Sequence, residues 1–454
     1  MLNFEHRTGP FPEGPPVYPR RDIPNWYRDA KLGFFVHWGL FTVPAWAETG
    51  RESVPIEDAY AHHQYAEWYG NTVRIPNSPA RRRHEECYGV GVSYEDLADR
   101  WGTGDFDPAE LVNNLAAVGG RYLIPTTKHH DGFCLWNTTT TGFNSVARGP
   151  RRDLVAELHA AARQVGLKYG VYFSGALDWH VSDFPPIESD RDLFRFRRND
   201  TAFADYAAAQ LSELIERFQP DVLWNDIEWP DSGKGEDEFG LAALLRRYFD
   251  AIPEGVINDR WGIPHHGFLT REYSFVPDIL AEPWEATRGL GRSFGYNQAE
   301  GSEDSLSGAE LIRLLVDVVS KNGNLLLNVG PTMFGEIPDI QRAALEVLGG
   351  WIQVNGAAIY GTRPWLRHGD QLPGSPTGYT AGEGIVNVFA LQPDAGMITL
   401  PEELRGRSVR WLSSEAAPAN EAADSIGAET GGLPIPESLR ATPVAVATVT
   451  GTRR

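Results

Sequence analysis

The stretch from Asp221 to Trp229 begins as a buried strand and ends in side chains that a strand core does not need. Because side chains alternate along a strand, Trp224 and Asp226 should project on the same side. An aromatic face can cover the C–H groups of a sugar ring while a nearby carboxylate attacks its anomeric carbon. The alternative interpretation is that Asp226 caps the helix that follows. The stretch therefore predicts either a carbohydrate-binding corner or a helix cap.

Polar and aromatic residues lie at or just after the ends of five predicted strands, including the one that ends at Asp226. They are Phe35 with His37, His129 with His130, Tyr172, Trp224 with Asp226, and Asp259 with Arg260. In a parallel barrel the carboxyl ends of all strands meet at one mouth, so these side chains should converge there. Donors, acceptors and aromatic walls together suit a polyhydroxylated ligand, and carbohydrate is the best match.

A metal site is the competing interpretation of the same histidines. His37, His129 and His130 could bind a metal ion together with an aspartate. Adjacent histidines on a regular strand point apart, however, and no His-x-His pair follows the first strand. A plainer reading of the pair is one buried and one exposed histidine. The spacing favours a site with no metal and no other cofactor.

Short β-branched or aromatic runs alternate with amphipathic patterns from about residue 26 to residue 351. The predicted strands are 33–37, 122–126, 168–173, 221–226, 255–259 and 324–329, with two more expected between 272 and 300. The predicted helices are 94–101, 109–118, 153–165, 202–218, 241–249, 309–320 and 340–354. Ser307 and Glu310 form a capping box before the sixth of these helices. The alternation predicts an α/β fold, a (β/α)8 TIM-like barrel that occupies residues 1–354.

The pattern changes after residue 354. Helical periodicity ends, and short apolar runs alternate with Gly and Pro turns, which predicts a C-terminal antiparallel β-sandwich over residues 355–454. We expect this domain to cover one flank of the barrel through an apolar interface and to contribute no catalytic group.

The composition limits the partners. The chain has 454 residues and a formal net charge of −20, which argues against nucleic acid and anionic membranes. No apolar run is long enough to span a bilayer, and no secretory signal is seen before Tyr18. With only two cysteines the expected location is the cytoplasm, and a homo-oligomer is possible.

Six motifs resemble one enzyme family. They are Phe35–Gly39, Lys128–Phe133, Trp224–Asp226, Asn258–Gly262, Gly323–Pro331 and Asn355–Tyr360. Together they resemble the α-L-fucosidases of glycoside hydrolase family twenty-nine, over nearly the whole chain. The resemblance implies retaining hydrolysis of terminal α-L-fucose on fucosylated glycans, through a covalent fucosyl-enzyme.

The resemblance also implies roles for individual residues. The family nucleophile falls on Asp226, and a Thr-x-Glu-Tyr segment places the acid/base on Glu272, with Asp259, Glu282 and Glu285 as rivals. The residues implied to bind the sugar are His37, Glu67, Trp68, His129, His130, Tyr172, Trp224 and Arg260, with Phe35 and Phe294 around its methyl group. A fucose-binding protein that lost catalysis is the alternative, and the presence of both acids argues against it. The basic stretch 81–84, in an unassigned loop, reads as solvated surface or as a contact for an acidic glycan.

Overall fold

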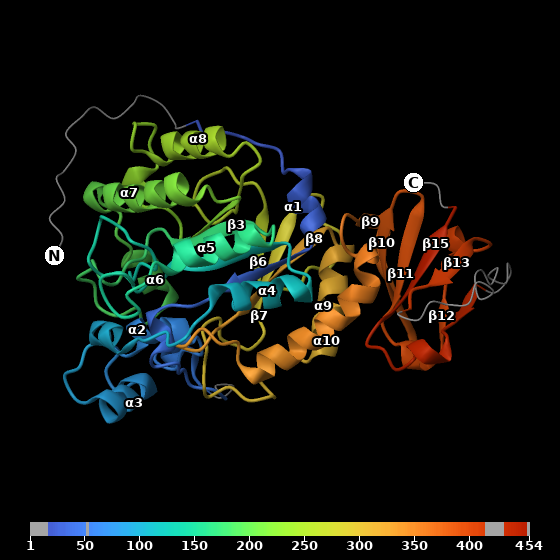
Figure 1. Cartoon of the computed structure of the whole chain (residues 1–454), viewed down its shortest axis with the longest axis horizontal. Coiled ribbons are helices and arrows are strands. Elements are labelled where there is room, and N and C mark those ends of the chain that lie inside the picture. Colours follow the sequence, from blue (N-terminus) through green and yellow to red (C-terminus); the bar gives the residue numbers. More distant parts are fainter. Residues whose placement is uncertain (1–16, 51–53, 414–430, 452–454) are drawn as a thin grey trace.

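The computed structural model describes residues 17–50, 54–413 and 431–451. Eight parallel strands form one curled sheet (Figure 1). Their order across the sheet is β5-β4-β3-β2-β1-β8-β7-β6. The strands are β1 (Leu32–Val36), β2 (Tyr122–Lys128), β3 (Lys168–Ser174), β4 (Val222–Asp226), β5 (Val256–Ile257), β6 (Leu269–Glu272), β7 (Trp284–Gly289) and β8 (Gly323–Val329). The barrel prediction is confirmed. The N-terminal stretch 1–16, which the localisation prediction used, lies outside the described residues.

One expectation about the strands was half wrong. We expected both missing strands between residues 272 and 300, but β6 ends at Glu272 and only β7 lies in that interval. The β6 sequence Leu-Thr-Arg-Glu is mostly polar and only partly buried, so it lacks the apolar run that marks a buried strand. Between β5 and β6 the sheet has no ladder. Instead the backbone N–H groups of Gly267 and Phe268 donate to the Ile257 carbonyl, at 2.9 and 3.2 Å.

Helices follow the strands around the barrel. The long ones are α4 (Pro108–Val118), α5 (Leu154–Gln164), α7 (Thr201–Phe218), α8 (Leu241–Ala251), α9 (Gly308–Ser320) and α10 (Asp339–Asn355). The predicted capping box of α9 is present, with Ser307 and Glu310 each accepting from the other's backbone N–H. The shorter helices are α1 (Asn25–Ala30), α2 (Tyr69–Thr72), α3 (Pro79–Tyr88) and α6 (Asp190–Arg195).

Two local predictions need correction. The segment expected to be an α-helix at 94–101 is a 3₁₀ helix, Glu95–Arg100. The basic stretch 81–84, expected in a loop, belongs to helix α3, which Ser78 caps by accepting the Arg81 N–H. Within α3, Arg81 pairs with Glu85 at 3.1 Å, and the Arg83 guanidinium lies 5.3 Å from the Trp46 ring centroid. These basic side chains therefore have local partners on the surface of the helix.

The C-terminal region is antiparallel. Five strands form one sheet, and two short strands pair beside it. They are β9 (Arg363–Leu372), β10 (Ser375–Gly382), β11 (Ile385–Ala390), β12 (Met397–Thr399), β13 (Ser408–Trp411), β14 (Gly432–Pro434) and β15 (Ala445–Thr450). The sheet lies beside α9 and α10 (Figure 1). Phe389 and Val446 pack into the same apolar core as the barrel helices, and Trp351 Nε1 donates to the Val444 carbonyl at 2.8 Å. In the described part of the chain no helix has the length and apolarity needed to cross a membrane.

Because this interface is apolar, we expect the barrel to depend on the C-terminal sheet. Truncation after Gly361 should expose the faces of α9 and α10, including Val316 and Trp351, and give insoluble or unstable protein. Soluble yield and the melting temperature of the truncated chain, beside the full chain, measure this. A soluble truncated barrel with full activity would contradict the structural role given to the sheet.

Candidate active site

Asp226 is the last residue of β4, and both of its carboxylate oxygens are held. The Tyr172 hydroxyl donates to Oδ2 at 2.9 Å, whereas Arg260 Nη1 and the Ile227 backbone N–H donate to Oδ1, each at 3.0 Å. The next α-helix, α8, begins at Leu241 with Gly240 as its N-cap, so Asp226 does not cap it. The helix-cap interpretation of this aspartate is therefore wrong.

The charges around Asp226 keep it ionised. Burial acts to raise the pKa of Asp226, but the charge of the Arg260 guanidinium and the hydrogen bonds from Arg260 and Tyr172 act in the opposite direction. The net result is a pKa below the ordinary aspartate value. A buried, ionised carboxylate at a strand end is what a nucleophile for a sugar carbon requires.

Glu272 ends β6 and shares a partner with Asp226. Arg260 Nη2 donates to Glu272 Oε2 at 2.8 Å while Nη1 of the same guanidinium contacts Asp226. The Glu272 side chain is 30% exposed and that of Asp226 only 12%, so Glu272 lies nearer to solvent. The guanidinium also lies 4.8 Å from the Trp224 ring centroid. One arginine thus brings the two predicted catalytic carboxyls and the aromatic wall together.

The three rival acids lie elsewhere. Asp259 accepts from the backbone N–H and hydroxyl of Thr270, at 3.1 and 2.6 Å. Glu282 precedes β7, is 67% exposed and pairs with His266. Glu285 is fully buried inside the barrel near the start of β7. Of the four acids, Glu272 alone forms an ion pair with the arginine that holds Asp226, within the ranges that the structure describes.

The two adjacent histidines do not point apart as expected. Their ring centroids are 4.1 Å apart, and both side chains are buried. His130 Nδ1 lies 2.7 Å from Ser174 Oγ, and the His129 ring stacks on Tyr172 with centroids 5.5 Å apart. Strand β2 ends at Lys128, so both histidines lie in the turn that follows it, where the Gly132 N–H donates to the His129 carbonyl at 3.1 Å. The alternation of a regular strand therefore does not apply to them.

His37 is positioned by a residue that sequence reasoning missed. Its Nδ1 lies 2.6 Å from Asn328 Oδ1, and Asn328 Nδ2 donates to the Phe294 carbonyl at 2.6 Å. The His37 ring also packs against Phe35 and Phe294, with centroids 5.1 and 5.0 Å away. Burial lowers the His37 pKa to about 4, so the imidazole is neutral at pH 7. An amide at the carboxyl end of the buried apolar strand β8 was the signal available in the sequence.

Glu67 and Trp68 come from a 3₁₀ helix, Ala66–Trp68, far from the barrel strands in sequence. Glu67 Oε2 accepts from the Gly295 N–H at 2.8 Å and from the Ser293 hydroxyl at 3.1 Å. The Trp68 ring lies 5.4 Å from that of His130. The loop after β7 thus carries Phe294 between two residues that fix Glu67. Nothing periodic in the sequence marks these contacts.

Glu67 should make stability depend on pH. Burial raises its pKa from 4.5 to about 7, so the folded chain holds this proton more tightly than the unfolded chain. This group contributes up to about 3 kcal/mol to the free energy of unfolding. The contribution is complete below about pH 4.5 and is lost as the pH rises to about 7. Glu67→Gln should therefore gain stability relative to wild type as pH rises through this range. Denaturant unfolding at pH 4.5 and 7.5, with exposed Glu282→Gln as control, measures it. If the free energies of unfolding of Glu67→Gln and wild type differ by the same amount at both pH values, the raised pKa of Glu67 is contradicted.

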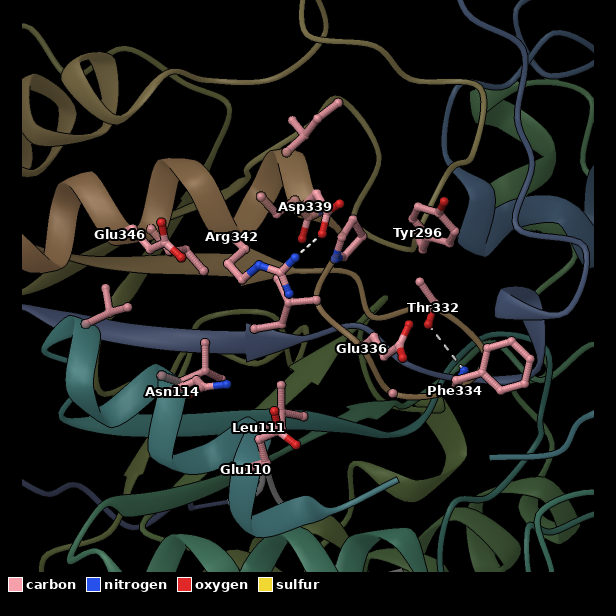
Figure 2. Close-up of a pocket in the computed structure, with 18 of the residues that line it drawn as sticks. Glu110, Leu111, Asn114, Tyr296, Thr332, Phe334, Glu336, Asp339, Arg342 and Glu346 are labelled. Atoms are coloured by element: carbon pink, nitrogen blue, oxygen red, sulfur yellow. Dashed lines mark hydrogen bonds and ion pairs between the residues drawn. The ribbon is translucent and has the colours of Figure 1, made fainter. Parts of the chain in front are cut away.

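A separate groove of about 1200 Å³ lies between α4 and α10 (Figure 2). Its lining includes the acids Glu110, Glu336, Asp339 and Glu346, with Arg342 paired to Asp339. None of the predicted site residues is among its lining residues. In the described ranges no three His, Cys, Asp or Glu side chains are grouped as metal ligands would be.

Comparison with known proteins places the chain among sugar hydrolases. A family model described as "Alpha-L-fucosidase" matches residues 17–357. The α-L-fucosidase of Dictyostelium discoideum is 31% identical over 395 residues, which cover 85% of this chain and 81% of that protein. Crystal structures of the Thermotoga maritima α-fucosidase with a mechanism-based inhibitor and with fucose are 41% and 40% identical, with TM-scores of 0.83 and 0.82. Each alignment covers 94% of this chain and 97% of that chain.

Proposed function

This chain belongs to the α-L-fucosidase family of glycoside hydrolases, and we propose that it is a retaining exo-enzyme that works through a covalent fucosyl-enzyme. The observation that carries the proposal is the Arg260 guanidinium, which contacts Asp226 and Glu272 at once. Retaining glycosidases need two carboxyls only ~5 Å apart, because no water must fit between the nucleophile and the sugar.

In the first step an Asp226 oxygen attacks the anomeric carbon of the fucosyl residue. The bond from that carbon to the glycosidic oxygen breaks, and Glu272 gives its proton to the leaving oxygen. In the second step Glu272 takes a proton from water, which attacks the same carbon and releases Asp226. Support for a covalent step comes from the Thermotoga maritima relative, which was solved with a mechanism-based inhibitor.

The surrounding residues suit a fucosyl ring in this position. His37, His129 and His130 present buried, neutral rings, since burial lowers the pKa of each. Neutral imidazoles can donate to or accept from hydroxyl groups. The Thermotoga maritima relative was also solved in complex with fucose. We therefore assign these three side chains, with Glu67, to the sugar hydroxyls.

Turnover of an aryl α-L-fucoside, with and without EDTA, tests the function. We expect hydrolysis that EDTA does not reduce, with α-L-fucose as the first product seen by NMR. Binding of fucose without turnover would identify a fucose-binding protein instead. Loss of turnover in EDTA would identify a metal-dependent hydrolase, and β-L-fucose as first product would contradict the retaining mechanism.

Phe35 should help the site to distinguish fucose from galactose. It is buried against His37 and Trp224, with ring centroids 5.1 and 4.8 Å away, and it offers no hydrogen bond. A hydroxymethyl group in place of the fucose methyl would bury a hydroxyl without a partner, at about 1–3 kcal/mol. We therefore expect α-L-galactosides to react roughly ten- to two-hundred-fold more slowly in kcat/KM.

The Phe35→Ala variant tests whether Phe35 sets the ratio of kcat/KM for α-L-fucosides to kcat/KM for α-L-galactosides. It should lose about 3–5 kcal/mol of stability because a buried ring is removed. It should also bring the fucoside and galactoside kcat/KM values closer together. If the variant loses stability but keeps the wild-type ratio, Phe35 only fills the barrel interior.

A further inference from the structure

One buried acid takes no part in the proposed chemistry. Glu285 lies near the N-terminal end of β7 and is completely buried. Oε2 accepts from the hydroxyls of Tyr27 and Tyr122, at 3.0 and 2.6 Å, and Oε1 accepts from Trp224 Nε1 at 3.0 Å. We call Glu285, Tyr27, Tyr122 and Trp224 the barrel-floor cluster. Its members come from α1, β2, β4 and β7, so it ties together elements that are distant in sequence.

The indole of Trp224 connects this cluster to the reaction centre. Tyr172 stacks on it at 5.5 Å between centroids and 22° between planes, and the Arg260 guanidinium lies 4.8 Å from its centroid. Tyr172 and Arg260 are the two side chains that donate to Asp226, one to each oxygen. The orientation of one indole therefore affects both donors that hold the proposed nucleophile.

We infer that Glu285 is a positioning residue for the fucosidase reaction, which fixes the Trp224 indole and thereby the geometry of Tyr172 and Arg260 around Asp226. The inference rests on the proposed function. Both Glu285 oxygens are occupied and buried, so this acid is not placed to protonate a leaving group. An apolar side chain could fill the floor without a buried charge, but it would leave the Trp224 N–H and both tyrosine hydroxyls without an acceptor.

The floor carboxylate should also respond to pH. Burial raises the pKa of Glu285 to about 7, although the hydrogen bonds from Tyr122, Trp224 and Tyr27 and the charge of Arg260 act to lower it. The side chain of Asn324 on β8 also contacts Tyr122. Protonation below about pH 7 removes an acceptor from the cluster, so kcat should fall there. Removing one donor with Tyr122→Phe should raise the Glu285 pKa and move this acidic limb to higher pH.

Two substitutions at Glu285 separate positioning from catalysis and from simple packing. Glu285→Leu keeps the volume but removes both acceptors, whereas Glu285→Gln keeps one oxygen for Trp224. Well below the melting temperature, we expect kcat to fall about a hundred-fold in the leucine variant and roughly ten-fold in the glutamine variant. The loss should be the same for aryl fucosides with good and poor leaving groups, and azide should not restore it. Glu282→Gln, on the exposed surface before the same strand, is the control and should keep wild-type kcat.

Each other outcome overturns the inference. Folded leucine and glutamine variants with wild-type kcat would show that Glu285 only fills the floor. A loss confined to poor leaving groups and rescued by azide would make Glu285 the acid/base. If the leucine variant fails to fold, the glutamine variant and the pH profile of Tyr122→Phe test the inference instead. An unchanged kcat in the glutamine variant, together with an acidic limb that Tyr122→Phe does not move, would overturn it. Wild-type protein that turns over no aryl α-L-fucoside would instead overturn the proposed function.

Discussion

Replacing Asp226 by alanine should abolish turnover of every α-L-fucoside, whatever its leaving group. The variant lacks the atom that forms the bond to the anomeric carbon, and a loss on the order of 10⁴-fold in kcat is expected for removal of a nucleophile. The fold should survive, because Arg260 keeps its contacts with Glu272 and Thr270 when the Asp226 carboxylate is removed. Steady-state kinetics with an activated aryl fucoside, together with a melting curve, measure both effects.

A small anion distinguishes loss of the nucleophile from general damage. Azide can enter the space left in Asp226→Ala and attack the same carbon, which should give β-L-fucosyl azide, with inverted configuration. Asp231→Ala, five residues further along and exposed, is the matched control and should keep wild-type kcat. Substantial residual activity in Asp226→Ala, with α-L-fucose still formed first, would remove Asp226 from the nucleophile role.

Replacing Glu272 by alanine should slow substrates in proportion to how poor their leaving groups are. Fucosides that need a proton on the leaving oxygen should lose about 10²–10⁴-fold in kcat/KM, the usual contribution of a general acid. An aryl fucoside with an acidic phenol needs no proton, so its first step should change little. A series of aryl fucosides with phenols of graded pKa measures this dependence.

Azide should act differently on this variant. The fucosyl-enzyme on Asp226 still forms from activated substrates, and azide attacks it without a general base, so turnover should rise and α-L-fucosyl azide should accumulate. Glu282→Ala, at an exposed acid that precedes β7 and pairs with His266, should match wild type. A uniform loss across the aryl series, with no response to azide, would give the acid/base role to another residue.

The sequence was informative where the evidence is local. Alternation and amphipathic spacing located most strands and helices, because each depends on neighbouring residues along the chain. Asp226 and Trp224 were identified for the same reason, since polar and aromatic residues at the end of an apolar strand stand out. Glu67 and Phe294 lie on irregular segments, and only the resemblance to a family pointed to them.

Tertiary structure decided what these residues do to one another. The sequence left four acids as candidates for the acid/base, and the contacts of Arg260 set Glu272 apart from Asp259, Glu282 and Glu285. Strand alternation predicted that His129 and His130 diverge, but β2 ends at Lys128 and both side chains are buried in the turn that follows.

The chain by itself therefore determined the order of its elements and the strand ends that carry chemistry, because both follow from short-range periodicity. Only the folded barrel decided that Glu285 lies beneath Trp224 and that Tyr172 and Arg260 share Asp226. Those contacts join residues from 34 to 61 positions apart. Hydrogen bonds and burial depend on distances in space, which no pattern along the chain records.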